Sequence, residues 1–263
     1  MKDERIVKTY VCIIEFGEFD PKEFSALYTR SRRALLGKIA WERARMQSAA
    51  AELAYLAAAR AALEDGAFVG EDTVGIRGCE LKDRFEYSYA ENGRPLLEGA
   101  CMSLSHTEGA ALAAVSSFGV GVDIERERHV SLLAAKRILN ASEYAELIAS
   151  PEEEKNGRLL EAWTAKESFL KLTGEGLSAG LDKLHYEREK AVIIRGATGE
   201  RAFVLRADIV SNSAYETQNE CEEKAAKKLF ACICQAESAE TVILRFFDAA
   251  DAAEFILNGS VCE

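Results

Sequence analysis

Two carboxylates stand two residues apart at the end of an apolar run near the middle of the chain. The sequence reads G-V-G-V-D-I-E over residues 119–125. If this run is a β-strand, alternate side chains share a face, so Asp123 and Glu125 point the same way, roughly 7 Å apart. Carboxylates at this distance repel each other, and a divalent cation between them would remove the repulsion. Mg²⁺ suits such oxygen ligands and leaves positions for water and phosphate; the alternative is a solvated strand end with two ordinary acids.

A second group of reactive side chains lies in W-T-A-K-E-S-F-L-K, at residues 163–171. On a helix, Trp163, Glu167 and Lys171 are four residues apart and share one stripe. Glu167 would supply a third metal ligand or a general base, and Lys171 a cation for a phosphate. The alternative is a surface ion pair that stabilises the helix by only about 0.2–0.5 kcal/mol.

A serine and a histidine are adjacent in M-S-L-S-H, at residues 102–106. Alternation along a strand would bury Met102 and Leu104 and place Ser105 on the opposite face, with His106 at the strand end. Such a pair could bind a phosphate. A catalytic triad is disfavoured, because the G-x-S-x-G turn that exposes a nucleophilic serine is absent.

These groups need a scaffold that mixes strands and helices. Alternating and β-branched runs predict strands at residues 10–16, 100–105, 110–116, 120–124, 183–187, 190–195, 201–210, 228–235 and 241–247. Helical periodicity predicts helices at residues 21–36, 38–64, 131–139, 141–149, 152–173 and 248–257. A turn is expected at 91–95, and a loop or short helix at 211–227. The order indicates two α+β halves, at residues 1–117 and 118–263, rather than a regular βαβ alternation.

Charge narrows the class of partner. The 263 residues include 44 acids and 33 lysines and arginines, for a net charge of −11. A chain this acidic is a poor general binder of nucleic acid or of an anionic membrane, so neither is expected as a partner. One stretch is an exception and carries six positive charges: Arg30, Arg32, Arg33, Lys38, Arg43 and Arg45.

The cysteines and the apolar runs indicate a compartment. Seven cysteines are spread along the chain without a C-x-x-C pair, which suits free thiols in a reducing compartment. The first residues do not read as a signal peptide, and no apolar run reaches the ~18 residues of a spanning helix. A cytoplasmic location is therefore expected.

Four motifs in this order resemble a known family. They are N-G-R-P at 92–95, S-L-S-H-T at 103–107, G-V-D-I-E at 121–125 and the helical motif at 163–171. Together, and with their spacing, they resemble the larger, Sfp-type 4′-phosphopantetheinyl transferases, over roughly residues 30–210. Each motif alone is weak, and their order and spacing give the resemblance its specificity.

The resemblance implies roles for individual residues. Asp123, Glu125 and Glu167 match the family's Mg²⁺ ligands, and Asp123, Glu167 and Lys171 are the expected catalytic group. The residues expected to contact coenzyme A are Arg33, Arg45, Arg94, Ser105, His106 and Lys171. Within the basic stretch, Arg30, Arg32 and Arg43 stay open as alternatives. Gln47 departs from the pattern, because the family often has an arginine there.

The resemblance also implies a fold and a reaction. The fold would be the α+β fold of the family, with two similar halves in a pseudo-twofold relation, in a monomer. The expected reaction moves 4′-phosphopantetheine from coenzyme A to a serine of an apo acyl or peptidyl carrier protein, with Mg²⁺, and releases 3′,5′-ADP. Two alternatives stay open: a non-catalytic coenzyme A-binding relative, and a Mg²⁺-dependent phosphohydrolase.

Overall fold

The computed structural model divides the chain into two compact units, residues 1–120 with 239–263 and residues 121–238. It describes residues 8–67, 78–176, 179–210, 228–236 and 241–258. Among these residues, no helix has the length and apolar character needed to cross a membrane. The predicted loop or helix at 211–227 lies outside the described residues.

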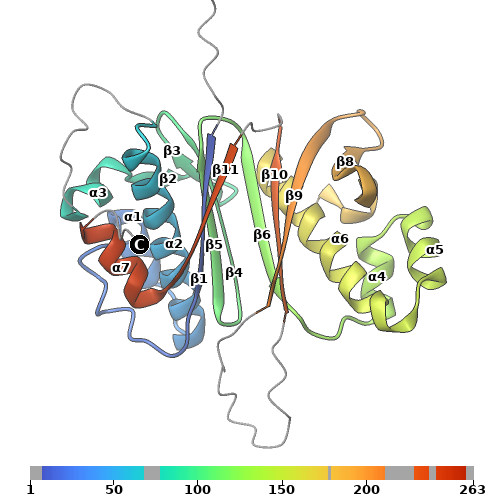
Figure 1. Cartoon of the computed structure of the whole chain (residues 1–263), viewed down its shortest axis with the longest axis horizontal. Helices are drawn as coiled ribbons and strands as arrows, with labels where there is room; N and C mark the ends of the chain where they lie inside the picture. Colours follow the sequence, from blue (N-terminus) through green and yellow to red (C-terminus); the bar gives the residue numbers. More distant parts are fainter. Residues whose placement is uncertain (1–7, 68–77, 177–178, 211–227, 237–240, 259–263) are drawn as a thin grey trace, which may run out of the picture. The chain divides into compact units, whose positions relative to one another are not determined.

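The first unit is built on a four-stranded sheet in the order β11-β1-β5-β4 (Figure 1). Its strands are β1 (Lys8–Glu15), β4 (Cys101–Thr107), β5 (Ala110–Ser116) and β11 (Thr241–Asp248). β1 pairs in parallel with β11 and antiparallel with β5, which pairs antiparallel with β4. A separate hairpin joins β2 (Tyr87–Tyr89) to β3 (Pro95–Leu97).

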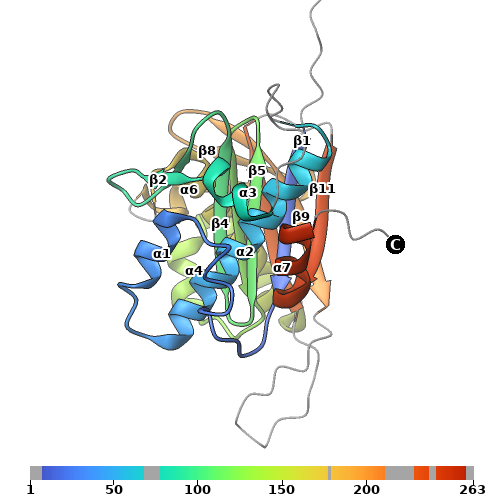
Figure 2. The same cartoon turned by 90° about the vertical axis from the view of Figure 1, so that its left-hand side faces the viewer.

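A helical layer covers the sheet of the first unit (Figure 2). Its helices are α1 (Arg30–Leu36), α2 (Glu42–Glu64), α3 (Gly78–Arg84) and α7 (Ala249–Asn258). Helix α2 is rich in alanine and is buried along most of its length against β1, β5 and α7. Small side chains let this helix lie close to the sheet, so the core of the unit forms around it.

The second unit has a five-stranded sheet in the order β6-β10-β9-β8-β7. Its strands are β6 (Val120–Arg126), β7 (Leu184–Glu187), β8 (Val192–Arg195), β9 (Arg201–Val210) and β10 (Lys228–Gln235). Its helices are α4 (Leu132–Ile138), α5 (Ala141–Ala149) and α6 (Glu152–Thr173), with short 3-10 turns η2 (Leu181–Lys183) and η3 (Arg188–Lys190). Helix α6 packs on β10 and ends at Gly174, whose φ of 78° is a left-handed cap.

Both units mix helices with a sheet, which confirms the α+β class. They differ from the expected halves, 1–117 and 118–263, at the C-terminal end. Strand β11 and helix α7 join the first unit because β11 pairs with β1 along its whole length. The pseudo-twofold relation between halves stays a prediction.

One predicted helix is shorter than expected. Residues 21–36 were expected to be helical throughout, but only α1, at Arg30–Leu36, is a helix. Asp20 accepts a hydrogen bond from the Lys22 N–H at 2.9 Å, which favours a turn, and residues 21–27 follow as turns. The side chain of Thr29 accepts from the Arg32 N–H at 3.2 Å, so the helix begins after Thr29.

Candidate functional site

The predicted acidic pair lies where strand β6 passes helix α6 in the second unit. Asp123 is buried on β6, and Glu125 is partly buried. The Lys171 ammonium on α6 donates to Oδ1 of Asp123 at 2.6 Å. The structure therefore brings the aspartate of one motif into contact with the lysine of the other.

Gly121 makes this close approach possible. A Cβ at this position would lie 2.0 Å from the Ser168 carbonyl oxygen and 2.4 Å from the Leu172 backbone nitrogen. No side chain fits there, so the backbones of β6 and α6 touch within two residues of Asp123. The glycine fixes the distance between the acidic pair and the helix that carries Glu167 and Lys171.

Glu167 is oriented by its own helix. The Trp163 indole N–H, one turn earlier, donates to Oε1 of Glu167. The Arg128 guanidinium lies over the Trp163 ring, 4.9 Å from its centroid, and also pairs with Glu125 at 3.5 Å. The four-residue spacing pointed to the Trp163 stripe, but nothing in the local sequence identified Arg128.

The electrostatics of this cluster show an excess of negative charge. Burial, reinforced by the charge of Asp123, raises the pKa of Glu167 to about 7. Burial and the same aspartate raise the pKa of Glu125, although Arg128 opposes the shift. The raised pKa values show that the ionised forms of Glu125 and Glu167 are unfavourable in this site. A bound cation would stabilise the ionised forms.

The donor set fits a hard divalent cation in chemistry, because it consists of carboxylate oxygens. Among the residues that the structure describes, no three His, Cys, Asp or Glu side chains are already gathered closely enough to hold one metal ion. Glu167 is hydrogen-bonded to Trp163 instead. The ligand roles of Asp123, Glu125 and Glu167 therefore stay predictions.

A cavity of about 650 Å³ opens beside Glu167. Leu133, Ile138 and Leu181 line it, together with Trp163 and Glu167. Its walls are mostly apolar, so the reactive carboxylate stands at the edge of a space that suits a neutral, partly apolar group.

The predicted coenzyme-binding residues of the first unit lie on four elements. Arg33 is exposed on α1, and Arg94 is half-exposed in the turn between β2 and β3. The Arg45 guanidinium on α2 donates to the Ile39 carbonyl oxygen at 2.7 and 3.2 Å, so it holds the loop before α2. On β4, Ser105 is buried and His106 is exposed.

The burial pattern of β4 differs from the expected one, and Gln47 has a structural role at the end of this strand. Leu104 is only partly buried, whereas Ser103 and Ser105 are buried, so the expected alternation of β4 is wrong. Strand β5 carries a nearly continuous run of small apolar residues beside β4, and small serine side chains fit that crowded surface. Gln47 donates to the Thr107 carbonyl oxygen at 3.1 Å and so holds the end of β4.

Comparison with known proteins agrees with the geometry. Residues 119–222 match the family model of the 4′-phosphopantetheinyl transferase superfamily. This stretch of the chain is similar to that superfamily. The match confirms the resemblance that the four motifs indicated, and it includes both β6 and α6.

Curated relatives support the same assignment. The chain is 33% identical over 118 residues to 4′-phosphopantetheinyl transferase Sfp of Bacillus subtilis (strain 168), covering 42% of this chain and 53% of that protein. It is 37% identical over 93 residues to psf-1 of Bacillus pumilus, covering 34% and 40%. It is 35% identical over 113 residues to HetI of Nostoc sp., covering 40% and 47%. The matched part thus spans about half the length of these relatives.

The matched stretch also contains a buried lysine that holds helix α6 in place. Lys166, in the same helical motif, is fully buried, and its ammonium donates to Glu143 at 2.5 Å and to the Ile138 carbonyl oxygen at 2.9 Å. Burial lowers the pKa of this lysine, although Glu143 opposes the shift. Lys166 therefore anchors α6 to the α4–α5 layer, away from Asp123.

Proposed function

We propose that this protein transfers the 4′-phosphopantetheine group of coenzyme A to a serine of an apo acyl or peptidyl carrier protein. The observation that carries the proposal is the contact between Asp123 and Lys171 inside a phosphopantetheinyl transferase superfamily domain. Glu125 and Glu167 belong to the same cluster through the charge of Asp123.

In the reaction, the serine oxygen attacks the phosphorus atom that bears pantetheine. The new P–O bond forms as the bond to the second phosphate breaks, and 3′,5′-ADP leaves with the electron pair. The serine proton passes to a base. Mg²⁺ held by Asp123, Glu125 and Glu167 would withdraw charge from the pyrophosphate when bound.

The chain's own residues account for the remaining steps. Lys171 places a positive charge beside Asp123, where it can offset charge on a phosphate oxygen. In the absence of a metal ion, burial and the charge of Asp123 raise the pKa of Glu167 to about 7, which suits a general base at physiological pH. The Trp163 indole N–H occupies Oε1 of this carboxylate and leaves Oε2 to meet the serine hydroxyl or the metal.

Coenzyme A is a polyanion, and the first unit supplies exposed positive charge for it. Arg33 on α1 and Arg94 in the β2–β3 turn are the side chains that we assign to the coenzyme's phosphates, with His106 of β4. This local charge would hold an anionic co-substrate on a protein whose net charge is −11.

The second substrate is a carrier protein, by the chemistry of the reaction. Leu132 and Leu133 at the start of α4 are 51% and 70% exposed, and Leu133 also lines the cavity beside Glu167. Apolar side chains at the mouth of such a cavity support docking of a carrier segment there. We further propose that the protein acts as a cytoplasmic monomer without nucleic-acid or membrane partners.

The test is the intact mass of carrier proteins after incubation with coenzyme A. A panel of apo acyl and peptidyl carriers is mixed with the protein, with Mg²⁺ or with a chelator. A gain of one phosphopantetheine group, only with metal, is the expected result. Coenzyme A bound without any carrier modification would favour the non-catalytic alternative. Coenzyme A cleaved without carrier modification would favour the phosphohydrolase.

A further inference from the structure

The first unit contains a buried ion pair between helices α1 and α2. Arg32 donates through Nε to Oε2 of Glu52 at 3.1 Å, and the two side chains are only 5% and 0% exposed. Burying two charges is costly unless additional hydrogen bonds satisfy both groups. Apolar side chains of similar size would stabilise this site at least as well, so stability alone does not account for the pair.

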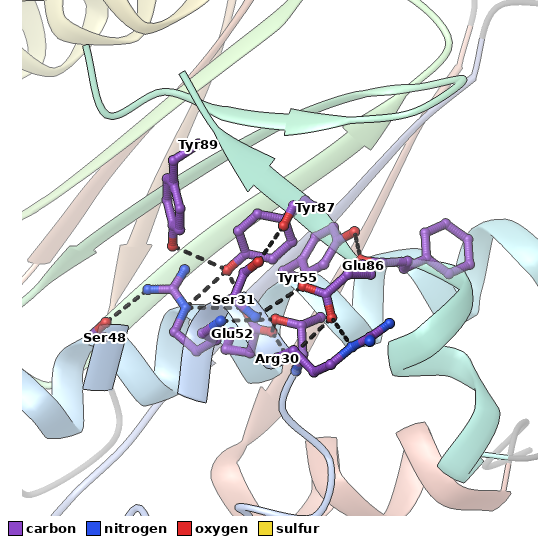
Figure 3. Close-up of polar contacts among 11 residues, drawn as sticks. Arg30, Ser31, Ser48, Glu52, Tyr55, Glu86, Tyr87 and Tyr89 are labelled. Carbon is purple, nitrogen blue, oxygen red and sulfur yellow. Dashed lines mark hydrogen bonds and ion pairs between the residues drawn. The ribbon is translucent and has the colours of Figure 1, made fainter. Parts of the chain in front are cut away.

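The carboxylate of Glu52 accepts hydrogen bonds from the start of α1 and from β2 (Figure 3). The Thr29 N–H and hydroxyl donate to Oε1 of Glu52 at 3.1 and 2.5 Å. The Tyr87 hydroxyl donates to Oε2 of Glu52 at 2.8 Å and accepts from Arg32 Nε at 3.0 Å. One buried carboxylate therefore holds the start of α1 and the first residue of β2 together.

The carboxylate of Glu86 also links the start of α1 to the β2–β3 hairpin (Figure 3). Glu86, directly before β2, accepts from the backbone N–H groups of Arg30 and Ser31 at 2.7 and 2.9 Å. The Ser31 hydroxyl donates to the Tyr87 carbonyl oxygen at 2.5 Å. The first turn of α1 is thus fixed to the β2–β3 hairpin through both side chains and backbone.

The two linked elements carry the arginines that we assign to coenzyme A. Arg33 is exposed on α1, and Arg94 lies in the hairpin turn, where the Ala90 N–H donates to its carbonyl oxygen at 2.8 Å. Arg32 is neutralised by Glu52 and buried, so it has no charge to offer a phosphate at the surface. This removes Arg32 from the candidates for coenzyme contact.

We propose that Glu52 and Tyr87 are positioning residues, which hold the two phosphate-binding arginines on α1 and on the β2–β3 hairpin at a fixed separation. The inference rests on the proposed function, because it takes the polyphosphate ligand to be coenzyme A. A preorganised pair of cations binds two phosphates of one ligand without the cost of ordering two separate segments.

The test is the Tyr87→Phe variant. It removes the hydroxyl that joins β2 to Glu52 and Arg32, and it keeps the ring, whose centroid lies 5.4 Å from that of Tyr55. We expect the KM for coenzyme A and the Kd for 3′,5′-ADP to rise about tenfold, the loss expected from one hydrogen bond to a charged group. The kcat should stay within about twofold of the wild type, because the reacting groups are untouched.

The control is Tyr10→Phe, which loses a tyrosine–carboxylate bond of the same kind within the same unit. Tyr10 donates to Asp65 at 2.5 Å, outside the cluster. This variant should show no change in KM or Kd. Equal effects of the two variants on KM would overturn the positioning role.

Hydrogen exchange provides a readout that does not depend on activity. In Tyr87→Phe, the amides of Arg30 and Ser31 and those of residues 90–94 should exchange faster together, while those of β1 and β5 stay protected. Unchanged exchange, or faster exchange throughout the unit, would overturn the proposal. Wild-type protein that fails to bind coenzyme A would refute the proposed function. Normal wild-type binding with the same Kd in Tyr87→Phe would refute the positioning role alone.

Discussion

Replacing Glu167 with glutamine should stabilise the metal-free protein above neutral pH. Burial and the nearby charge of Asp123 raise the pKa of Glu167 to about 7, so the ionised form is unfavourable in the folded protein. Glutamine has nearly the same shape and carries no charge. Its amide oxygen can still accept the Trp163 indole N–H, so the local packing should be kept.

The sign of the effect follows from the two pKa values. Below the ordinary pKa of 4.5, Glu167 is protonated in both the folded and the unfolded chain and contributes no difference. Between that value and about 7, the unfolded chain ionises first, so the free energy of unfolding falls as pH rises. The full difference is about 3 kcal/mol at 1.36 kcal/mol per pKa unit, an upper bound because Asp123 shares the interaction.

Urea unfolding at pH 5 and pH 8, in the presence of a chelator, measures this directly. Relative to wild type, Glu167→Gln should gain about 2 kcal/mol in the free energy of unfolding between these two pH values. The m-values should match, so that the comparison reports stability alone. Parallel pH dependence of the two proteins would refute the argument that the site strains its own carboxylate.

Added Mg²⁺ should narrow the difference in stability between the two proteins at pH 8. A ligand that binds only the folded state stabilises it by about 2.7 kcal/mol at one hundred times its Kd. Wild type has the three predicted carboxylate ligands, and the glutamine variant has two, so wild type should gain more. Equal stabilisation of both proteins by Mg²⁺ would refute the ligand role of Glu167 and leave the pH result standing.

Three further substitutions test other parts of the argument. Asp123→Ala should reduce carrier modification about 100-fold or more, since it removes both a predicted metal ligand and the partner of Lys171, while circular dichroism stays native; undiminished transfer would exclude the assignment. Gly121→Ala should lower the melting temperature sharply, because its Cβ would lie 2.0 Å from the Ser168 carbonyl oxygen; calorimetry checks this, and a native melting temperature would contradict it. Lys166→Met should cost about 3–5 kcal/mol of stability by leaving Glu143 buried without its cation, as measured by urea unfolding; a loss below 1 kcal/mol would show that the pair is not an anchor.

The sequence predicted the elements that carry the second-unit site well. Strand β6 and helix α6 were both expected from local periodicity, and the bounds of α6 match the prediction at both ends. The family resemblance placed Asp123 and Lys171 in one catalytic group, but the direct contact between them was not predicted. Periodicity states which side chains share a face, and it does not state which helix packs on which strand.

The hairpin and the buried cluster of the first unit were harder to predict. β2 and β3 have three residues each, too few to show an alternating pattern, although the turn between them was expected. In the sequence, Arg32 is one member of the basic stretch and one open alternative for contact with the coenzyme. Its burial depends on Glu52, which lies on another helix, so no local pattern could indicate it.

The helical motif at 163–171 combines two functions on one helix, because it carries the reactive residues and also anchors the helix through Lys166. Gly121 of β6 meets α6 at Ser168 and Leu172, the residues directly after Glu167 and Lys171, and no Cβ fits there between the backbones. Lys166 immediately precedes Glu167 but points to Glu143 and is fully buried. A rotation of α6 that moved the reactive stripe away from Asp123 would also break the Lys166 anchor. Lys166 therefore fixes the rotation of α6 about its axis, and this rotation sets the direction in which Glu167 and Lys171 point.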